Sequence, residues 1–493
     1  MSNFVVQFSL ITEKYQEDIL NKRFEIGRNI YNSLLNKSQS RYKEMIKTKL
    51  YRSIKLELSE LYKKDKTKSK RKTELCRQLN ELYKKFGINE YSFHGDVKLM
   101  QHHFKDNIDS FTAQKIASNL WKAYEKLLFG NGNKVYYKKY DSMNSLEGKS
   151  NKTGIKFKDD TILWNGLEIP VKIDYNNYYE YQSFQNDIAY CRLIRKFIKN
   201  EYKFYVQIVF KGVPPFKVTK EGEIKRDIGE GDVGLDIGTQ TIAISSKNDV
   251  KIYELADRVQ NIENEKLKLL RKLDRSRRKS NPENYNEDGT IKNQGNKKVV
   301  WKKSNRYIRE QNKLKELYRK QADVRKYQHE CLANEIIKQG DKIYVETMNY
   351  KGLQKRAKET TVNEKTGKIN KKKRFGKSLA NKAPAMLLEI IDRKLSYFDK
   401  KLIKINTWSV KASQYNHIED NYKKKKLSDR WNDFNEIKVQ RDMYSAFLIM
   451  NVNEDLNSID KDKCKQRFEG FIVAHNVEVK RLSGNKNLSS IAI

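Results

Sequence analysis

The feature that most constrains this chain is an aspartate in the middle of an apolar strand. The segment from Val233 to Ile244 is rich in β-branched and apolar residues, which predicts a strand that leads into a hairpin. Burying the carboxylate of Asp236 costs free energy unless it is paired or binds a cation. Glycines at positions 234 and 238 allow a backbone or a ligand to approach closely. The segment therefore predicts a functional carboxylate on a buried strand.

Two functional interpretations of this hairpin remain open from the motif alone. One is the first strand of a ribonuclease-H-like nuclease, with Asp236 as a metal ligand. The other is the phosphate-binding hairpin of the sugar-kinase and actin-like ATPases, which carries the same pattern of Asp, any residue, Gly and Thr. A turn aspartate without a ligand is the plainer structural alternative. The ATPase interpretation needs a second glycine-rich phosphate loop downstream, and glycine is sparse after residue 295.

Two further carboxylates complete a candidate metal site. Glu346 ends the short apolar strand predicted at 342–346, and Asp442 opens a helix predicted to start near Arg441. A strand-terminal glutamate and a helix-capping aspartate are the simpler explanations of each residue taken alone. Together with Asp236, however, three converging carboxylates can hold two divalent cations roughly 3.5–4 Å apart. Ligands that are all oxygen suit Mg²⁺ or Mn²⁺, so these three residues are the predicted catalytic metal ligands.

The net charge indicates a polyanionic partner. The chain has 102 Lys and Arg against 63 Asp and Glu, a formal net charge of +39. A compact protein this basic attracts nucleic acid or an anionic membrane surface. No run approaches the ~20 apolar residues of a membrane-spanning helix, and the first residues resemble a strand, not a signal peptide. We therefore expect a cytoplasmic protein that binds nucleic acid and no membrane.

Sulfur and imidazole ligands are not expected at a metal site. The four cysteines lie far apart and form no CxxC pair: Cys76, Cys191, Cys331 and Cys464. This spacing argues against a disulfide framework and against a sequence-local zinc finger. The six histidines are scattered along the chain. We therefore expect carboxylates to bind the metal, and no zinc.

The pattern along the chain predicts a multidomain α+β protein. Residues 1–12 are expected to form one strand, 13–130 mostly helices, and 131–229 a strand-rich, barrel-like segment to which the first strand returns. Pro214-Pro215 and the polar stretch up to Asp232 resemble a linker. The later predictions are two long basic helical stretches in 256–339, a strand at 342–346, a loop at 355–377, a helix at 384–400, a strand at 402–408, irregular chain at 410–440 and a helix from Arg441.

Basic and aromatic residues are candidate nucleic-acid contacts. Basic side chains neutralise phosphates, and aromatic rings stack on bases. Strand aromatics equally often belong to a core, and charged runs usually form a solvated face. The candidates are Tyr137, Lys138, Lys139, Arg271, Lys272, Arg275, Arg277, Arg278, Lys371, Lys372, Lys373 and Arg374.

With these residues identified, the chain resembles the RuvC domain of the compact type V-F CRISPR effector nucleases and of the transposon-encoded TnpB proteins. The segment 234–238 is similar to the first RuvC motif, 344–349 to the second, and Arg441-Asp442 to the third. The basic stretches within 269–330 are similar to the helical hairpin between the first two motifs. The resemblance covers about 205–450, and the N-terminal half matches only in outline.

The resemblance implies a helical recognition lobe, a wedge-like β-barrel and a ribonuclease-H-like (RuvC) α/β nuclease domain. In this sequence the lobe would be 13–130, the barrel 1–12 with 131–229, and the nuclease 230–409 with 436–493. Residues 410–435 would be a target-nucleic-acid-binding insert. Family members usually carry two CxxC pairs in that insert, and their absence here is the departure that argues against zinc.

The resemblance also implies an activity, which is cleavage of double-stranded DNA at a single site that holds two Mg²⁺ or Mn²⁺ ions. The expected partners are a guide RNA and the target duplex with its displaced single strand. Compact CRISPR effectors of this kind can act as two protein copies on one RNA, so a homodimer is a further partner that the resemblance suggests. The basic run 371–374 would be a lid over the site, with a disordered basic loop as the equal alternative. A CRISPR effector is favoured over a TnpB-type nuclease. A guided binder that does not cut and a DDE-type transposase are further alternatives.

Overall fold

The computed structural model describes residues 3–64, 69–130, 132–225, 227–292, 295, 299–355, 362, 375–425, 429–434 and 437–484. The chain divides into two compact units, Met1–Lys217 and Val218–Ile493. The division lies within the segment that the sequence suggests as a linker. Within the described parts, no helix is both long and apolar enough to cross a membrane.

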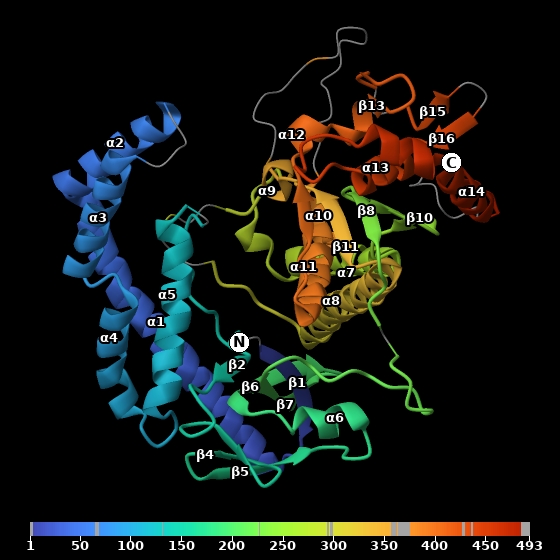
Figure 1. The fold of residues 1–493 in the computed structure, drawn as a ribbon. Helices are drawn as coiled ribbons and strands as arrows, with labels where there is room; N and C mark the ends of the chain where they lie inside the picture. The colour runs from blue at the N-terminus through green and yellow to red at the C-terminus, as the bar shows by residue number, and fades with distance from the viewer. Residues whose placement is uncertain are drawn as a thin grey trace. The chain divides into compact units, whose positions relative to one another are not determined.

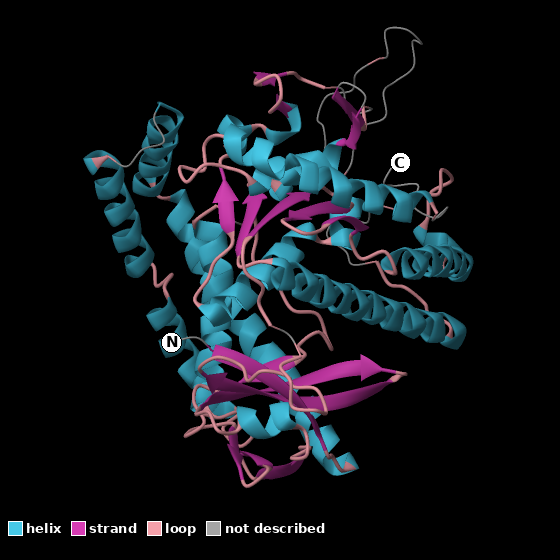
Figure 2. Cartoon of the chain, turned by 45° about the vertical axis from the view of Figure 1, so that its right-hand side comes forward, coloured by secondary structure: helices cyan, strands magenta, loops and turns pink. Residues whose placement is uncertain are grey.

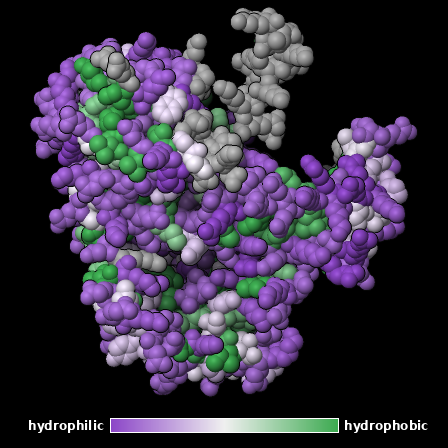
Figure 3. Space-filling view, turned by 90° about the vertical axis from the view of Figure 1, so that its right-hand side faces the viewer, coloured by the Kyte–Doolittle hydropathy of each residue, from purple (hydrophilic) through white to green (hydrophobic). Residues whose placement is uncertain are grey.

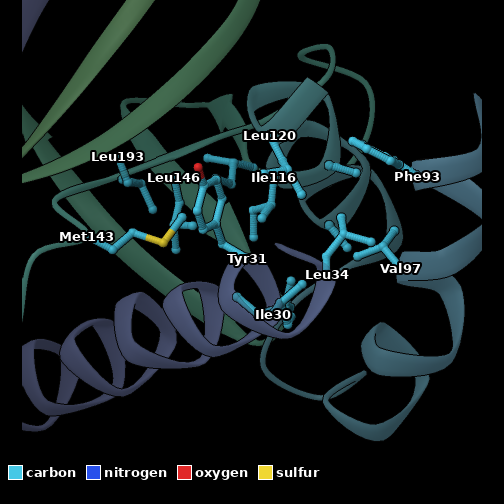
Figure 4. Close-up of a cluster of buried hydrophobic side chains, with 14 of the residues drawn as sticks. Ile30, Tyr31, Leu34, Phe93, Val97, Ile116, Leu120, Met143, Leu146 and Leu193 are labelled. Atoms are coloured by element: carbon cyan, nitrogen blue, oxygen red, sulfur yellow. The ribbon is translucent and has the colours of Figure 1, made fainter. Parts of the chain in front are cut away.

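The helices of the first unit form an array that shares its core with a sheet (Figure 1). They are α1 (Lys14–Lys47), α2 (Lys49–Lys64), α3 (Lys70–Lys85), α4 (Glu90–His103), α5 (Ser110–Leu128) and the short α6 (Tyr178–Ser183). Asp109 begins α5, because its carboxylate accepts hydrogen bonds from the backbone N–H groups of Phe111 and Thr112, both at 2.9 Å. Figure 4 shows how α1, α4 and α5 meet the strands: Tyr31 and Leu34 lie among Phe93, Ile116 and Leu146.

The sheet of the first unit has seven strands in the order β2-β6-β7-β1-β5-β4-β3. Their bounds are β1 (Asn3–Leu10), β2 (Ser145–Glu147), β3 (Lys156–Lys158), β4 (Thr161–Trp164), β5 (Leu167–Lys172), β6 (Ile188–Ile198) and β7 (Glu201–Lys211). β1 pairs antiparallel with β7 and with β5, so the N-terminal strand is central to the sheet. The described strands form a curled half-barrel and not the predicted barrel, because β2 and β3 each pair with one strand only.

The second unit has helices on both faces of a five-stranded mixed sheet (Figure 2). The strand order is β10-β9-β8-β11-β12, with β8 (Asp232–Ile237), β9 (Thr241–Ser246), β10 (Val250–Glu254), β11 (Lys342–Glu346) and β12 (Ile403–Ile405). β8, β9 and β10 are antiparallel, whereas β11 runs parallel to both β8 and β12. The major helices are α7 (Val259–Ser280), α8 (Asn305–Gln339), α11 (Pro384–Leu395), α13 (Arg441–Met450) and α14 (Lys461–Ser483).

Alternate residues of the strands face different helices, as the period of two in a strand requires. Val233, Leu235 and Ile237 of β8 pack in one core with α8 and α11. Ala243 of β9 and Val250 of β10 pack in the other core, with α13 and α14. The even-numbered residues of β8, Gly234 and Asp236 among them, therefore face α13.

Short elements correct three of the predicted boundaries. The predicted strand 402–408 is only β12, because the Asn406 side chain accepts a hydrogen bond from the Trp408 backbone N–H and begins α12 (Thr407–Val410). The predicted helix 384–400 ends at Leu395 and continues as a 3-10 turn. Residues 410–440 are not irregular throughout but contain η3 (Ala412–Gln414), β13 (Tyr415–Asn416), β14 (Asn421–Tyr422), β15 (Trp431–Phe434) and β16 (Ile437–Gln440). The remaining elements are η1 (Pro282–Asn284), α9 (Tyr350–Leu353), α10 (Gly376–Lys382) and η2 (Ser396–Phe398).

Candidate active site

The sheet register brings Asp236 and Glu346 together. In the parallel pair of β8 and β11, Leu235 lies opposite Val345, so the next residue of each strand is also adjacent. Side chains that lie opposite each other in a ladder point to the same face of the sheet. Both carboxylates therefore lie at the C-terminal ends of neighbouring strands, on the face covered by α13. Each side chain is half-buried.

Gly234 is the reason that the third carboxylate reaches this face. A Cβ atom at this position would lie 2.0 Å from the carbonyl oxygen of Ala446 and 2.6 Å from the backbone nitrogen of Met450. Only a residue without a side chain allows α13 to lie this close to β8. The close packing fixes the first turn of α13, and with it Asp442, beside the end of β8. At Gly238 the nearest atom is 3.5 Å away, so no close approach within the described chain requires that glycine.

The carboxylates interact electrostatically. Burial raises the pKa of Asp236 well above its ordinary value, and the negative charges of Asp442 and Glu346 raise it further. The charge of Arg441 and a hydrogen bond with Ser445 act in the opposite direction but do not compensate. Burial also raises the pKa of Glu346, to about 7. A bound cation would relieve both effects, because it stabilises the ionised carboxylates.

Asp442 has two arginine neighbours. Its Oδ1 accepts hydrogen bonds from Nε and Nη2 of Arg441, at 3.1 and 3.0 Å. Nη1 of Arg430 lies 3.6 Å from Oδ2. Among the described residues, no three His, Cys, Asp or Glu side chains form a group that could hold a metal ion. Asp442 is thus near enough to Asp236 to raise its pKa, but its carboxylate pairs with guanidinium groups.

The donor set nevertheless fits hard divalent cations. All three groups are carboxylates, which Mg²⁺ and Mn²⁺ prefer, and the raised pKa of Asp236 reflects its burial together with the negative charges of Asp442 and Glu346. For all three to become ligands, the carboxylate of Asp442 has to exchange at least one arginine for the ions. The four cysteines are all free thiols, so they form no disulfide.

Tyr350 is a site residue that sequence reasoning missed. It follows β11 by four residues, and together with Glu346 it lines one pocket. Its hydroxyl is buried and has no hydrogen-bond partner among the described residues. Burial and the nearby charge of Asp236 raise its pKa to about 12, so the phenol stays neutral and can donate a hydrogen bond. A tyrosine just after a strand carries no sequence signal that separates this role from core packing.

The candidate contacts on α7 fall into two groups. Lys272 pairs with Glu310 at 2.9 Å, and Arg277 and Arg278 both pair with Asp274, at 2.7 and 2.9 Å. These cations already have protein partners. Their neighbours Arg271 and Arg275 are exposed, lie four residues apart on one face, and make no ion pair with a described residue. They are the members of the predicted set on α7 with charge available for a phosphate.

The remaining candidate nucleic-acid contacts differ in whether they already have a partner within the protein. The Tyr137 hydroxyl lies 3.2 Å from acceptor oxygens of both Asn36 and Gln39, and Nζ of Lys138 lies 4.9 Å from the ring centroid of Tyr31. Lys139 is exposed. The predicted run of Lys371, Lys372, Lys373 and Arg374 lies outside the described residues. The face drawn in Figure 3 is largely hydrophilic, as expected of so basic a chain.

Comparison with known proteins gives structural similarity only. No protein-family model matches the chain, and no curated protein matches its sequence. Among solved structures, a cryo-EM structure of a Cas12f1–sgRNA–target DNA complex aligns with a TM-score of 0.42 and 11% sequence identity, over 92% of this chain and 99% of that chain. A cryo-EM structure of a CRISPR–Cas12f ternary complex aligns with a TM-score of 0.23 and 13% identity, over 90% of this chain and 86% of that chain.

Proposed function

We propose that this protein is a metal-dependent, RNA-guided DNA endonuclease with one RuvC-type, ribonuclease-H-like site in its second unit. The observation that supports metal-dependent hydrolysis is the proximity of three carboxylates that are far apart in the sequence. Glu346 and Asp442 lie close enough to Asp236 for their charges to raise its pKa. A mixed sheet with helices on both faces and carboxylates at the ends of adjacent strands fits such a site. Burying several carboxylates close together without a cation costs free energy, which favours a metal-binding role over a structural one.

The three carboxylates would hold two Mg²⁺ or Mn²⁺ ions. When bound, the ions supply an activated water as nucleophile and stabilise the leaving oxygen of a phosphodiester. Asp236 and Glu346 lie on rigid strands, so their positions are set before substrate arrives. Asp442 would have to exchange an arginine for the ions in order to join them, and the freed guanidinium would then be available to pair with a phosphate oxygen. The buried Tyr350 hydroxyl supplies a neutral donor beside Asp236.

The guide and target are inferred from charge and from the motif resemblance. A net charge of +39 fits a protein that neutralises many phosphates. In this proposal, a structured guide RNA pairs with one DNA strand while the protein reads a short flanking motif and holds the displaced strand. Arg271 and Arg275 are the α7 residues proposed to contact the nucleic-acid backbone. A guide from a CRISPR array is favoured, and a guide from a transposon end is the alternative. In the CRISPR case the proposal includes two copies of the chain on one RNA.

The test combines RNA identification with cleavage. The protein is purified from cells that carry its native flanking DNA, and the bound RNA is sequenced. The complex is then assayed on a matched DNA target with Mg²⁺ and with EDTA. We expect a dominant RNA and Mg²⁺-dependent cutting that Asp236→Ala abolishes without loss of RNA. Asp249→Ala is the matched control, because Asp249 follows β9 at the opposite end of the sheet from Asp236.

The outcomes separate the alternatives. A repeat-derived scaffold in the RNA identifies a CRISPR effector, and a transposon-end RNA identifies a TnpB-type nuclease. Guided binding without cutting in Mg²⁺ or Mn²⁺ would refute the nuclease assignment. A preparation without enriched RNA would refute guidance, and strand transfer of labelled element ends would then identify a transposase.

A further inference from the structure

An exposed tryptophan follows β12, the strand that pairs with the strand of Glu346. Trp408 is 88% exposed, whereas Trp164 in the core of the first unit is 2% exposed. Tryptophan is highly buried on average, because its large apolar surface is costly to hydrate. The Trp408 ring stacks on no other aromatic ring among the described residues. An indole left in solvent in this way is a candidate contact for a binding partner.

The exposure of Trp408 does not result from a loose loop. Asn406 begins helix α12, and its backbone N–H donates to the carbonyl oxygen of Leu456 at 3.0 Å. The Asn406 side-chain amide donates to Oδ1 of Asn457 at 3.0 Å. Val410, on the other side of α12, is fully buried. The helix is therefore anchored on both sides of Trp408, and the indole is held outward at little conformational cost.

The same anchor joins Trp408 to the active-site strand. Glu346 of β11 lies opposite Ile405 of β12, three residues before the tryptophan. The backbone N–H of Thr347, the residue after Glu346, donates to Oγ1 of Thr407 at 3.0 Å, and that hydroxyl lies 3.2 Å from the Thr347 carbonyl oxygen. The two strand ends are thus tied together by side-chain hydrogen bonds. Trp408 follows Thr407 directly, so its backbone lies at the same end of the sheet as Glu346.

Two exposed lysines lie within four residues of Trp408 in the chain. Lys404 is exposed, but it lies opposite Val345, which packs with α8 and α11, so its side chain lies on the other face of the sheet from Glu346. Lys411 is exposed at the end of α12, where it adopts a left-handed backbone conformation with φ of 44°. Neither ammonium group forms an ion pair with a described residue. An exposed aromatic ring with an available cation, here Lys411, three residues away can bind a nucleic-acid strand by stacking on a base and neutralising a phosphate.

We propose that Trp408 is a stacking platform for an unpaired base of the strand that enters the carboxylate site, with Lys411 on a flanking phosphate. The proposal rests on the proposed function and adds a substrate-positioning residue to it. Stacking on an aromatic face tolerates any base, because every base has a π-face. This property suits a nuclease whose sequence specificity comes from elsewhere. It also implies a preference for unpaired over duplex nucleic acid at the site.

Binding is measured first, without cleavage. Asp236→Ala protein is titrated with a fluorescein-labelled thymidine oligonucleotide in Ca²⁺, and anisotropy and tryptophan fluorescence are recorded. We expect the oligonucleotide to quench tryptophan fluorescence and Trp408→Ala in this background to weaken binding about tenfold. Trp408→Phe should retain most of the affinity but lose most of the quenching. Tyr91→Ala, which removes an equally exposed aromatic at 88% in the first unit, is the matched control.

Cleavage by the otherwise unchanged protein then separates this proposal from the proposed function. Trp408→Ala should raise KM for a pre-opened target severalfold with little change in kcat, because stacking acts on binding. Equal oligonucleotide affinity of parent and Trp408→Ala proteins, with both folded by circular dichroism, would overturn the platform even if the nuclease is active. Weakened binding together with no cleavage by any variant would support the platform and refute the nuclease. Loss of affinity in Tyr91→Ala equal to that in Trp408→Ala would also overturn the proposal.

Discussion

Replacing Gly234 by alanine should displace α13 and disable the site. The added Cβ would lie 2.0 Å from the Ala446 carbonyl oxygen, whereas ordinary van der Waals contact begins at 3.4 Å. Relieving the clash therefore requires a movement of about 1.4 Å, that is 3.4 − 2.0. The obstructing atoms are backbone, which cannot rotate away as a side chain can. Overpacking typically costs about 1–3 kcal/mol, and we expect about 3 kcal/mol here because a whole helix has to shift.

The shift should affect catalysis more than stability. Asp442 lies in the first turn of α13, so it moves with the helix. A misplacement of about 1 Å in a catalytic group can reduce the rate about 100-fold. Guanidinium denaturation followed by far-ultraviolet circular dichroism measures the loss of stability. The Mg²⁺-dependent cleavage assay measures the loss of activity.

Gly470→Ala on α14 is the control for Gly234→Ala. A Cβ there meets no atom within 4 Å, and alanine is the better helix former by about 1 kcal/mol, so stability should hold or rise. If Gly234→Ala protein has the stability and cleavage rate of the parent, the close packing of β8 and α13 does not position the site.

Three further predictions address the metal and the nucleic acid. Because the pKa of Glu346 is raised from 4.5 to about 7 in the folded protein, ionisation of this carboxyl opposes folding. Without divalent ions, the free energy of unfolding measured in urea should therefore fall as the pH rises from about 4.5 to 7. Glu346→Gln should lack the part of this fall that Glu346 causes. If Glu346→Gln lost as much stability as the parent over this pH range, the loss would not come from Glu346. Added Mg²⁺ should raise the melting temperature of the parent at pH 7.5 but not of Asp236→Asn, and equal shifts would argue against a metal site. Arg271→Ala with Arg275→Ala should weaken nucleic-acid binding and reduce the magnitude of the salt slope by about 1.4–1.8, whereas Arg277→Ala, which loses its pair with Asp274, should leave the slope unchanged.

Local sequence patterns predicted many elements of the second unit. The run 342–346 is β11, and the helix predicted near Arg441 begins at that residue. Both predictions depend on hydrophobic periodicity over a short window, which is the most reliable signal in a single sequence. The strand predicted at 402–408 was too long, because a helix capped by Asn406 begins within it. Capping depends on a few atoms and is weakly encoded, so boundaries are harder to predict than elements.

Contacts across the chain could not be predicted in this way. Nothing in the local sequence indicates that the Tyr350 hydroxyl is buried beside Asp236, or that Lys272 already pairs with Glu310 while Arg271 does not pair with any described residue. These contacts depend on which helices pack against each other. The sequence of a basic run is the same whether its side chains form ion pairs or not. The barrel expected of the first unit likewise depended on whether its edge strands meet, and β2 and β3 do not pair.

A carboxylate on an apolar strand, two more at element ends and a charge suited to a polyanion could all be predicted from the amino-acid sequence. The reason is that composition and the periodicity of apolar residues are properties of a short stretch of chain. Three features became known from the folded chain alone: β11 lies parallel to β8, Gly234 lets α13 approach, and Asp442 faces both Asp236 and an arginine. Strand register and helix packing are set by long-range complementarity of side chains, which no local window of the sequence contains.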